Sequence, residues 1–168
     1  MNQELFDLTG KVALVTGASK GLGKAIALAL ASAGADLALH ARNVDDLKTV
    51  KSLIETQGRR AEIFCTDVLD KICIEDSVAA TLETFGQIDI LVNNAGVNIR
   101  KPVLELSTDE WDLVLNTNLR GYFLVAQVVV PAMLSRGCGK VINVAPFLAR
   151  WDSPPSWPMR RAKEGWCR

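Results

Sequence analysis

The chain has 168 residues and 49% of them are hydrophobic, so it can form one domain with a substantial core and is not a disordered segment. Lysine plus arginine and aspartate plus glutamate both number 19, and this balance argues against nucleic acid or an anionic membrane as the main partner. The longest apolar stretch, residues 122–134, is interrupted by a glutamine and is too short to span a bilayer, and the first residues lack the pattern of a secretion signal. The four cysteines have neither metal-ligand nor redox spacing, so we expect reduced thiols in a cytoplasmic protein without a metal site.

Strand-like and helix-like segments alternate from residue 11 to about residue 144. Short apolar runs predict strands at residues 12–15, 36–40, 61–65, 88–92 and 141–144. Apolar residues at helical spacing predict helices between them, at residues 22–33, 47–54, 78–85 and 107–136. Asn43 is a possible cap of the second helix and Gly86 ends the third, while Ser107 and Glu110 form a capping-box pattern at the start of the fourth. Pro131 should kink or locally break that last helix.

This alternation predicts an α/β fold, a Rossmann-like doubly wound parallel sheet with strand order 3-2-1-4-5, truncated after the fifth strand. The ligand crevice of such a sheet lies at the switch point beside the first strand. We expect residues 1–144 to form one dinucleotide-binding domain. Residues 145–168 hold four of the six prolines and three of the four tryptophans, and we expect an irregular tail there.

A glycine-rich run, residues 16–23, follows the first strand and opens the first helix, which is the context in which such a run binds a dinucleotide. Gly17 and Gly21 would keep side chains away from a pyrophosphate, and Gly23 would let the helix pack closely. The free N–H groups and the dipole at the helix start favour phosphate. A tight turn without a ligand is the alternative. The residues of the run that we expect to contact the cofactor are Gly17, Ser19, Lys20, Gly21, Leu22 and Gly23.

Residues 8–144 resemble the short-chain dehydrogenase/reductase family. The resemblance is carried by the glycine-rich run together with Asp67-Val68, residues 93–96 (Asn-Asn-Ala-Gly) and residues 116–121 (Asn-Thr-Asn-Leu-Arg-Gly), in the order and at the spacing of the family. Within the family, the sequence of these motifs is similar to that of bacterial sugar-acid dehydrogenases of the gluconate type and of 3-oxoacyl-carrier-protein reductases. The resemblance implies hydride transfer between a nicotinamide cofactor and a carbonyl or alcohol of a small molecule such as a sugar acid, ketone or oxoacyl compound. It also implies a homo-oligomer.

The resemblance assigns further cofactor contacts. Asp67 and Val68 are implied to contact the adenine, with a simple helix cap as the alternative for Asp67. Asn94, Ala95 and Gly96 follow the fourth strand. The asparagine amides there can hold adjacent strand ends while Gly96 lets the backbone approach the cofactor, and both interpretations can be true.

Charge predicts which cofactor the chain prefers. NAD enzymes of this fold place an acid after the second strand to accept the ribose hydroxyls. Here Ala41 takes that place, Arg42 follows it, and Lys20 lies in the glycine turn, so two cations and no acid favour the 2′-phosphate of NADP(H) over NAD. The alternative is that both cations are solvated surface charges. Asp45 and Asp46 are interpreted as charges of a first helical turn.

The resemblance also implies a catalytic serine after the fifth strand, a tyrosine 13 residues later and a lysine four residues beyond it. Counting along the chain places Pro146, Met159 and Lys163 at these positions. Neither Pro146 nor Met159 can donate a proton, and Tyr122 matches no catalytic position. Asn118 is implied to position a water in a proton relay, helped by a local helix distortion, or else it is a helix-interior residue satisfied by backbone. We therefore expect this chain to be catalytically inactive.

An alternate reading frame of residues 145–168 permits serine, tyrosine and lysine at the family positions, so we hypothesise a frameshifted family segment, which sequencing of the gene tests. The fifth strand is then an exposed edge, the long helix exposes an apolar stripe, and the oligomer of the family is doubtful for this chain. We interpret Trp111 as a core or helix-interface residue and His40 as a strand-end residue rather than a catalyst. Three functions stay open: an active dehydrogenase or reductase, a cofactor-binding remnant, or a non-functional fragment.

Overall fold

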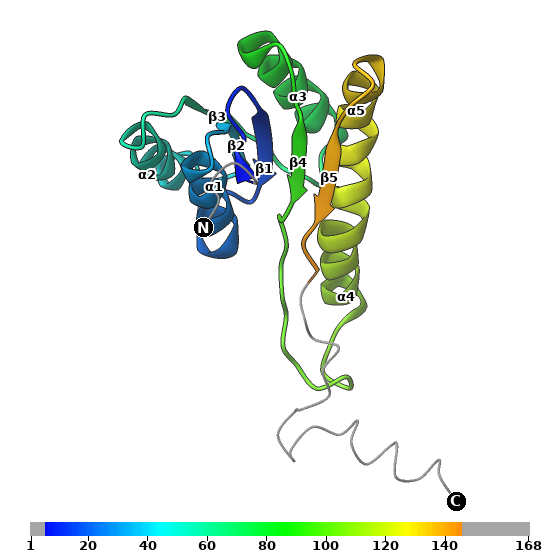
Figure 1. Cartoon of the computed structure of the whole chain (residues 1–168). Helices are drawn as coiled ribbons and strands as arrows, with labels where there is room; N and C mark the ends of the chain where they lie inside the picture. Colours follow the sequence, from blue (N-terminus) through cyan, green and yellow to red (C-terminus); the bar gives the residue numbers. More distant parts are fainter. Residues whose placement is uncertain (1–5, 146–168) are drawn as a thin grey trace, which may run out of the picture.

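The computed structural model describes residues 6–145 and contains one parallel sheet flanked by helices (Figure 1). Its strands are β1 (Val12–Thr16), β2 (Asp36–Ala41), β3 (Ala61–Cys65), β4 (Ile90–Asn93) and β5 (Lys140–Asn143). The sheet order is β3-β2-β1-β4-β5 and every pairing is parallel, so the predicted fold class and strand order are confirmed. The predicted division at residue 144 stays a prediction, because residues 146–168 lie outside the described part.

The helices are α1 (Gly21–Ser32), α2 (Val44–Glu55), α3 (Lys71–Phe85), α4 (Thr108–Leu115) and α5 (Gly121–Ser135). Helices α1 and α2 cover one face of the sheet, while α3 and α5 cover the other (Figure 1). Strand β1 serves both layers, because Ala13 and Val15 belong to the first core cluster and Leu14 to the second. Because the strands are parallel, the carboxyl ends of β1, β2 and β4 lie together at one end of the sheet.

The helix boundaries follow from their capping residues. The Asn43 side chain accepts from the amides of Asp45 and Asp46, and the predicted capping box is present, with Ser107 Oγ accepting from Glu110 N at 3.1 Å. Helix α3 ends at Gly86 in a left-handed conformation (φ 76°). These termini were all predicted from sequence.

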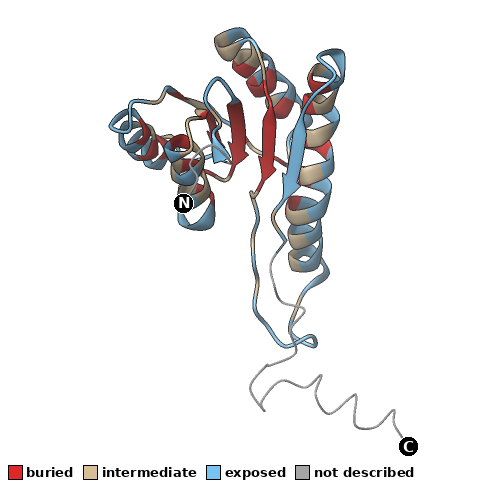
Figure 2. Cartoon of the chain, in the orientation of Figure 1, coloured by how far each residue is buried: buried red, intermediate tan, exposed pale blue. Residues whose placement is uncertain are grey.

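Strand β5 is the exposed edge of the sheet. All four of its residues are exposed, whereas β1 and β4 are buried along their whole length (Figure 2). No further strand pairs with β5 within residues 6–145. The expected exposed edge is therefore confirmed for the described part of the chain.

Helices α4 and α5 are joined by a π-helical turn, Asn116–Arg120, and the three form one continuous helix of 28 residues. Helix α5 runs through Pro131, so a local break there is wrong, while the alternative of a kink stays a prediction. Pro131 and Gln127, whose carbonyl loses its amide partner, are both exposed, so water can satisfy that carbonyl. The helix is distorted at the π-turn, where Gly121 N donates to Asn116 O.

By length and composition alone the 28-residue helix, which includes residues 122–134, would be able to cross a membrane, but a core helix meets the same two criteria. Its inner residues explain much of its apolar character. Leu124, Val129 and Met133 are buried in the second core cluster, together with Ile74 and Val78 of α3. The helix thus covers the sheet on that side.

The outer side of the same helix carries an apolar face, which we define as Trp111, Leu115, Leu119 and Phe123. All four side chains are exposed, Trp111 to 55% and Leu119 to 69%. The prediction that Trp111 is a core residue is therefore wrong, and its helix-interface alternative stays a prediction. The expected apolar stripe on the long helix is confirmed.

Candidate functional site

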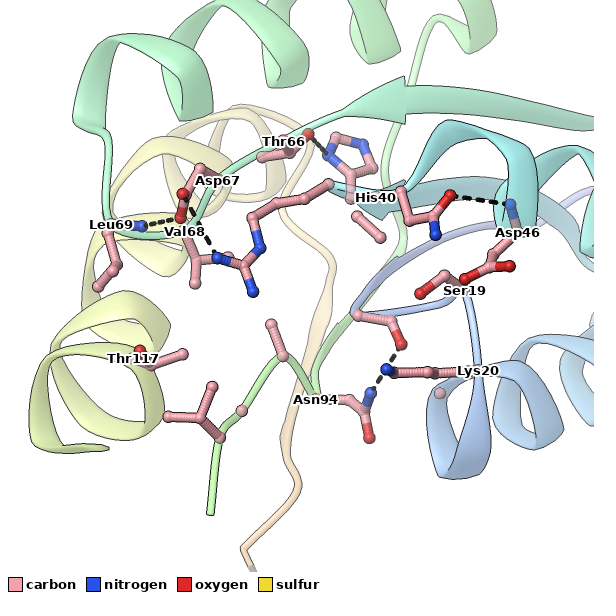
Figure 3. A pocket seen from close by; sticks show the side chains of 18 of the residues that line it. Ser19, Lys20, His40, Asp46, Thr66, Asp67, Val68, Leu69, Asn94 and Thr117 are labelled. Atoms are coloured by element: carbon pink, nitrogen blue, oxygen red, sulfur yellow. Dashed lines mark hydrogen bonds and ion pairs between the residues drawn. The ribbon is translucent and has the colours of Figure 1, made fainter. Parts of the chain in front are cut away.

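A cleft of about 370 Å³ lies at the carboxyl ends of the central strands (Figure 3). It collects nearly all of the predicted cofactor contacts: Gly17, Ser19, Lys20, Leu22, Gly23, Arg42, Asp67, Val68, Asn94, Ala95 and Gly96. Of the predicted site residues within the described part, Gly21 and Asn118 do not line it. The cleft also contains residues that sequence reasoning did not assign to the site, among them Asp46, Thr66 and Val97.

The glycine turn is fixed by close contacts with the end of β4. Gly17 has φ +65°, and a Cβ there would lie 2.9 Å from Ala95 Cα. A Cβ on Gly23 would overlap the Gly17 carbonyl, whose carbon would be only 2.9 Å away. Gly21 has φ +54° and faces open space. Close packing thus requires glycine at 17 and 23, while the room beside the helix start lies at Gly21.

Helix α1 begins differently from helices α2, α3 and α4. Its N-cap, Lys20, makes no side-chain cap hydrogen bond, and its first turn contains no acidic residue. Helices α2, α3 and α4 all have a side chain that accepts from their first amides. The first amides of α1 are therefore left for an acceptor from outside the helix, and Lys20, Leu22 and Gly23 at this start line the cleft. A phosphate group fits this start.

Amide side chains hold the ends of β1, β4 and β5 together, as predicted. Asn94 Nδ2 donates to Thr16 O at 3.0 Å, and Asn93 Nδ2 donates to Asn143 Oδ1 at 2.9 Å. Thr16 Oγ1 accepts from the amides of Asn94 and Ala95 at 2.9 and 3.0 Å. The role of Thr16 was not predicted, because a threonine at a strand end has no distinctive sequence pattern.

Arg42, directly after β2, and Asp67, in the loop after β3, both line the cleft, and Figure 3 labels Asp67 there. Arg42 Nη1 lies 4.0 Å from Asp67 Oδ2. Asp67 Oδ1 accepts from Leu69 N at 3.0 Å, whereas the N-cap of α3 is Asp70. The alternative interpretation of Asp67 as a helix cap is therefore wrong. Asp46 also lines the cleft, so Arg42 and Lys20 share it with more carboxylates than the sequence indicated.

His40 forms the buried floor of the cleft. Its Nε2 lies 2.9 Å from Thr81 Oγ1 and its Nδ1 lies 2.9 Å from Thr66 Oγ1. Because Thr81 Oγ1 donates to Ser77 O at 2.8 Å, we assign the proton of the ring to Nε2, and Nδ1 then accepts from Thr66. Burial lowers the pKa of His40 to about 3. A neutral, fully hydrogen-bonded ring agrees with the predicted structural role.

Asn118 acts on the cleft through a neighbour. Its Nδ2 donates to Val97 O at 2.9 Å, and its Oδ1 accepts from Val97 N at 2.8 Å. The side chain is thus satisfied by backbone, as in the alternative interpretation, and it fixes the loop that follows β4. The expected helix distortion is present, because Asn118 lies in the π-turn.

The remaining candidates lie away from the cleft or outside the described residues. Tyr122 donates to Val144 O at 2.9 Å, and burial raises the pKa of its hydroxyl. Pro146, Met159 and Lys163 belong to the part of the chain that the structure does not describe. Between residues 6 and 145 no group of histidine, cysteine, aspartate or glutamate side chains is arranged to hold a metal ion.

The family model described as short chain dehydrogenase matches residues 11–154 of the chain. Gluconate 5-dehydrogenase of Gluconobacter oxydans is 39% identical over 160 residues, which cover 95% of this chain and 62% of the relative. The 3-oxoacyl-[acyl-carrier-protein] reductase FabG of Thermotoga maritima is 32% identical over 158 residues, which cover 94% of this chain and 64% of the relative. The chain thus spans less than two thirds of the length of these two relatives.

Two solved structures with bound cofactor have the same architecture. A metagenomic short-chain oxidoreductase in complex with NADP matches with a TM-score of 0.79 and 36% identity, over 88% of this chain and 66% of the other. An NAD⁺-bound xylitol dehydrogenase matches with a TM-score of 0.82 and 33% identity, over 87% of this chain and 56% of the other. Proteins similar to this chain therefore hold either NADP or NAD⁺.

Proposed function

Because the chain belongs to the short-chain dehydrogenase family of oxidoreductases, whose members bind NAD(P), we propose that its cleft binds NADP(H). The start of α1, without a side-chain cap and beside the open space at Gly21, is the observation that carries this proposal. Its free amides and the helix dipole suit the pyrophosphate. Asp67 and Val68 would form the wall for the adenine, and Ala95 and Gly96 would line the path toward the nicotinamide.

The preference for the 2′-phosphate rests on charge. Arg42 follows β2, where an NAD enzyme would place an acid, and its side chain lines the cleft together with Lys20. Arg42 can bind a phosphate with two donors at once. Asp67 reduces this preference, because its carboxylate lies 4.0 Å from the guanidinium of Arg42 in the same cleft. We therefore propose NADP(H) as the better ligand and NAD(H) as the weaker one.

The bound cofactor would supply a hydride to, or accept one from, a carbon of a small carbonyl or alcohol compound. The residues of this chain would hold and orient it, with Asn118 fixing Val97 beside the cleft. The substrate oxygen also needs a proton donor, and the sequence has Pro146 and Met159 where the family has serine and tyrosine. We propose that the chain binds the cofactor without turnover.

The second candidate function is the active enzyme, a dehydrogenase or reductase of a sugar acid, ketone or oxoacyl compound. The matches to gluconate 5-dehydrogenase and to the oxoacyl reductase favour it. For this chain we place either function in the cytoplasm, because the three cysteines of the described part are free thiols. A non-functional fragment is the remaining alternative.

One experiment separates these functions. The purified 168-residue chain is titrated with NADPH while cofactor fluorescence is recorded, and NADPH oxidation is then followed with 5-ketogluconate or an acetoacetyl thioester. Saturable fluorescence enhancement without oxidation is the expected result. Oxidation that depends on the carbonyl compound would favour the active enzyme. A folded chain that binds no NADPH would contradict the proposal, and a chain without a cooperative melt would point to the fragment.

A further inference from the structure

An ion pair in the cleft joins two residues with separate roles in the proposed site. Arg42 Nη1 and Asp67 Oδ2 lie 4.0 Å apart, and both residues line the cleft. Under the proposed function, Arg42 would bind the 2′-phosphate of the cofactor and Asp67 would contact its adenine. The two side chains are nevertheless directed at each other.

The surroundings of the pair leave it free to exchange partners. Asp67 uses Oδ1 for the Leu69 amide at 3.0 Å and turns Oδ2 toward Arg42. The Arg42 side chain is 70% exposed and the Asp67 side chain 39%, so solvent screens their attraction. Asp45 is engaged by Lys48 at 2.9 Å and is not a partner for Arg42. Asp67 is therefore the one carboxylate of the described chain that is paired with this guanidinium.

We propose that Asp67 competes with the 2′-phosphate of the cofactor for Arg42 and thereby weakens the preference of the cleft for NADP(H). This inference rests on the proposed function. A 2′-phosphate carries more charge than a carboxylate and offers more acceptor oxygens, so Arg42 leaves Asp67 when NADP(H) binds. NAD(H) has no 2′-phosphate, so the pair stays intact when it binds. Binding of NADP(H) therefore requires the Arg42–Asp67 pair to break, whereas binding of NAD(H) does not.

The size of this cost follows from the exposure of the pair. Exposed ion pairs are worth enough to change an equilibrium by about two- to fivefold. Any contact of Asp67 with the adenine is the same for both cofactors. The ratio of the NADPH and NADH affinities therefore isolates the competition, because contacts that both cofactors make cancel in it.

A double-mutant cycle on the full chain tests the proposal. Dissociation constants for NADPH and NADH are measured by fluorescence, and those for adenosine 2′,5′-bisphosphate and 5′-ADP by calorimetry. Asp67→Asn removes the charge while its Oδ1 can still accept from Leu69 N, and Arg42→Gln removes the shared partner. Asp46→Asn is the matched control, since it removes the same charge from another side chain of the cleft. Far-UV circular dichroism verifies folding, and Asp67→Ser replaces Asp67→Asn if the latter does not fold.

We expect Asp67→Asn to raise the NADPH-to-NADH affinity ratio by about two- to fivefold when Arg42 is present and to leave it unchanged in the Arg42→Gln background. The same pattern is expected for the two adenosine phosphates. An equal rise in both backgrounds, or a rise matched by Asp46→Asn, would mean a general field effect and would overturn the competition. An unchanged ratio with both cofactors bound would overturn this inference alone. Failure of the unaltered chain to bind either cofactor would overturn the proposed function and this inference together.

Discussion

Acidification should destabilise the protein through His40, whose ring is 2% exposed and hydrogen-bonded to Thr66 and Thr81. Burial lowers its pKa in the folded chain to about 3, against the usual 6.5. The unfolded chain therefore takes up a proton that the folded chain does not accept. The contribution to stability is complete above pH 6.5 and is lost as the pH falls from 6.5 toward 3.

The magnitude follows from the two pKa values. Each pH unit below 6.5 costs about 1.4 kcal/mol, so lowering the pH from 7 to 5 should reduce the free energy of unfolding by about 2 kcal/mol. Carboxylates also titrate on acidification, so the comparison needs a variant that lacks the ring. His40→Gln keeps an amide donor and acceptor at this position but has no group that titrates in the window.

Urea unfolding followed by circular dichroism at pH 7 and pH 5 provides the measurement. The unaltered chain should lose about 2 kcal/mol more than His40→Gln over this interval, although the variant is less stable at pH 7. Equal losses in the two proteins would refute the reasoning, because the ring would then titrate as it does in the unfolded chain.

Three further predictions concern the glycine turn, the apolar face of the long helix and the loop after β4. Gly23→Ala should destabilise the fold by about 1–3 kcal/mol and weaken NADPH binding, because the new Cβ overlaps the Gly17 carbonyl of the glycine turn. This loss is expected although alanine favours helices. Thermal melts measure the stability and NADPH titration measures the binding. The exposed apolar face favours self-association of the chain, so Leu119→Lys should reduce the self-association measured by light scattering. The melting temperature should not fall, since the Leu119 side chain is 69% exposed. The control Leu104→Lys changes an exposed loop residue and should leave self-association unchanged. Asn118→Ala should lower the free energy of unfolding by about 1–3 kcal/mol, because the backbone N–H and C=O of Val97 both lose their hydrogen-bond partner. An unchanged melting temperature would contradict the role assigned to the Asn118 side chain.

Much of the fold could be predicted from sequence because its signals are local. Asn43, Gly86 and the Ser107–Glu110 pair mark helix ends through contacts within a few residues, and the structure confirms each of them. The family resemblance, now confirmed by the family model, also gave the residues that surround the cleft. The strand order followed from handedness and short connections.

The parts that could not be predicted depend on contacts distant in sequence or on alternatives of similar energy. Asp67 and Asp70 are both plausible helix caps, and only the path of the loop after β3 assigns the cap to Asp70. Whether Trp111 is buried depends on what packs beside α4, and its own spacing is that of a core residue. The pairing of Arg42 with Asp67 joins residues 25 positions apart, and it appears only when β2 and β3 lie side by side.

The central claim is that the start of α1 and its surroundings bind the phosphates of NADP(H). Titration of the ¹⁵N-labelled 168-residue chain with NADPH, followed through its backbone amide resonances, tests it most directly. The account predicts saturable shifts concentrated at residues 20–23, at Asp67 and Val68, and at Ala95 and Gly96. A folded chain whose amides at residues 20–23 do not respond to saturating NADPH would contradict it.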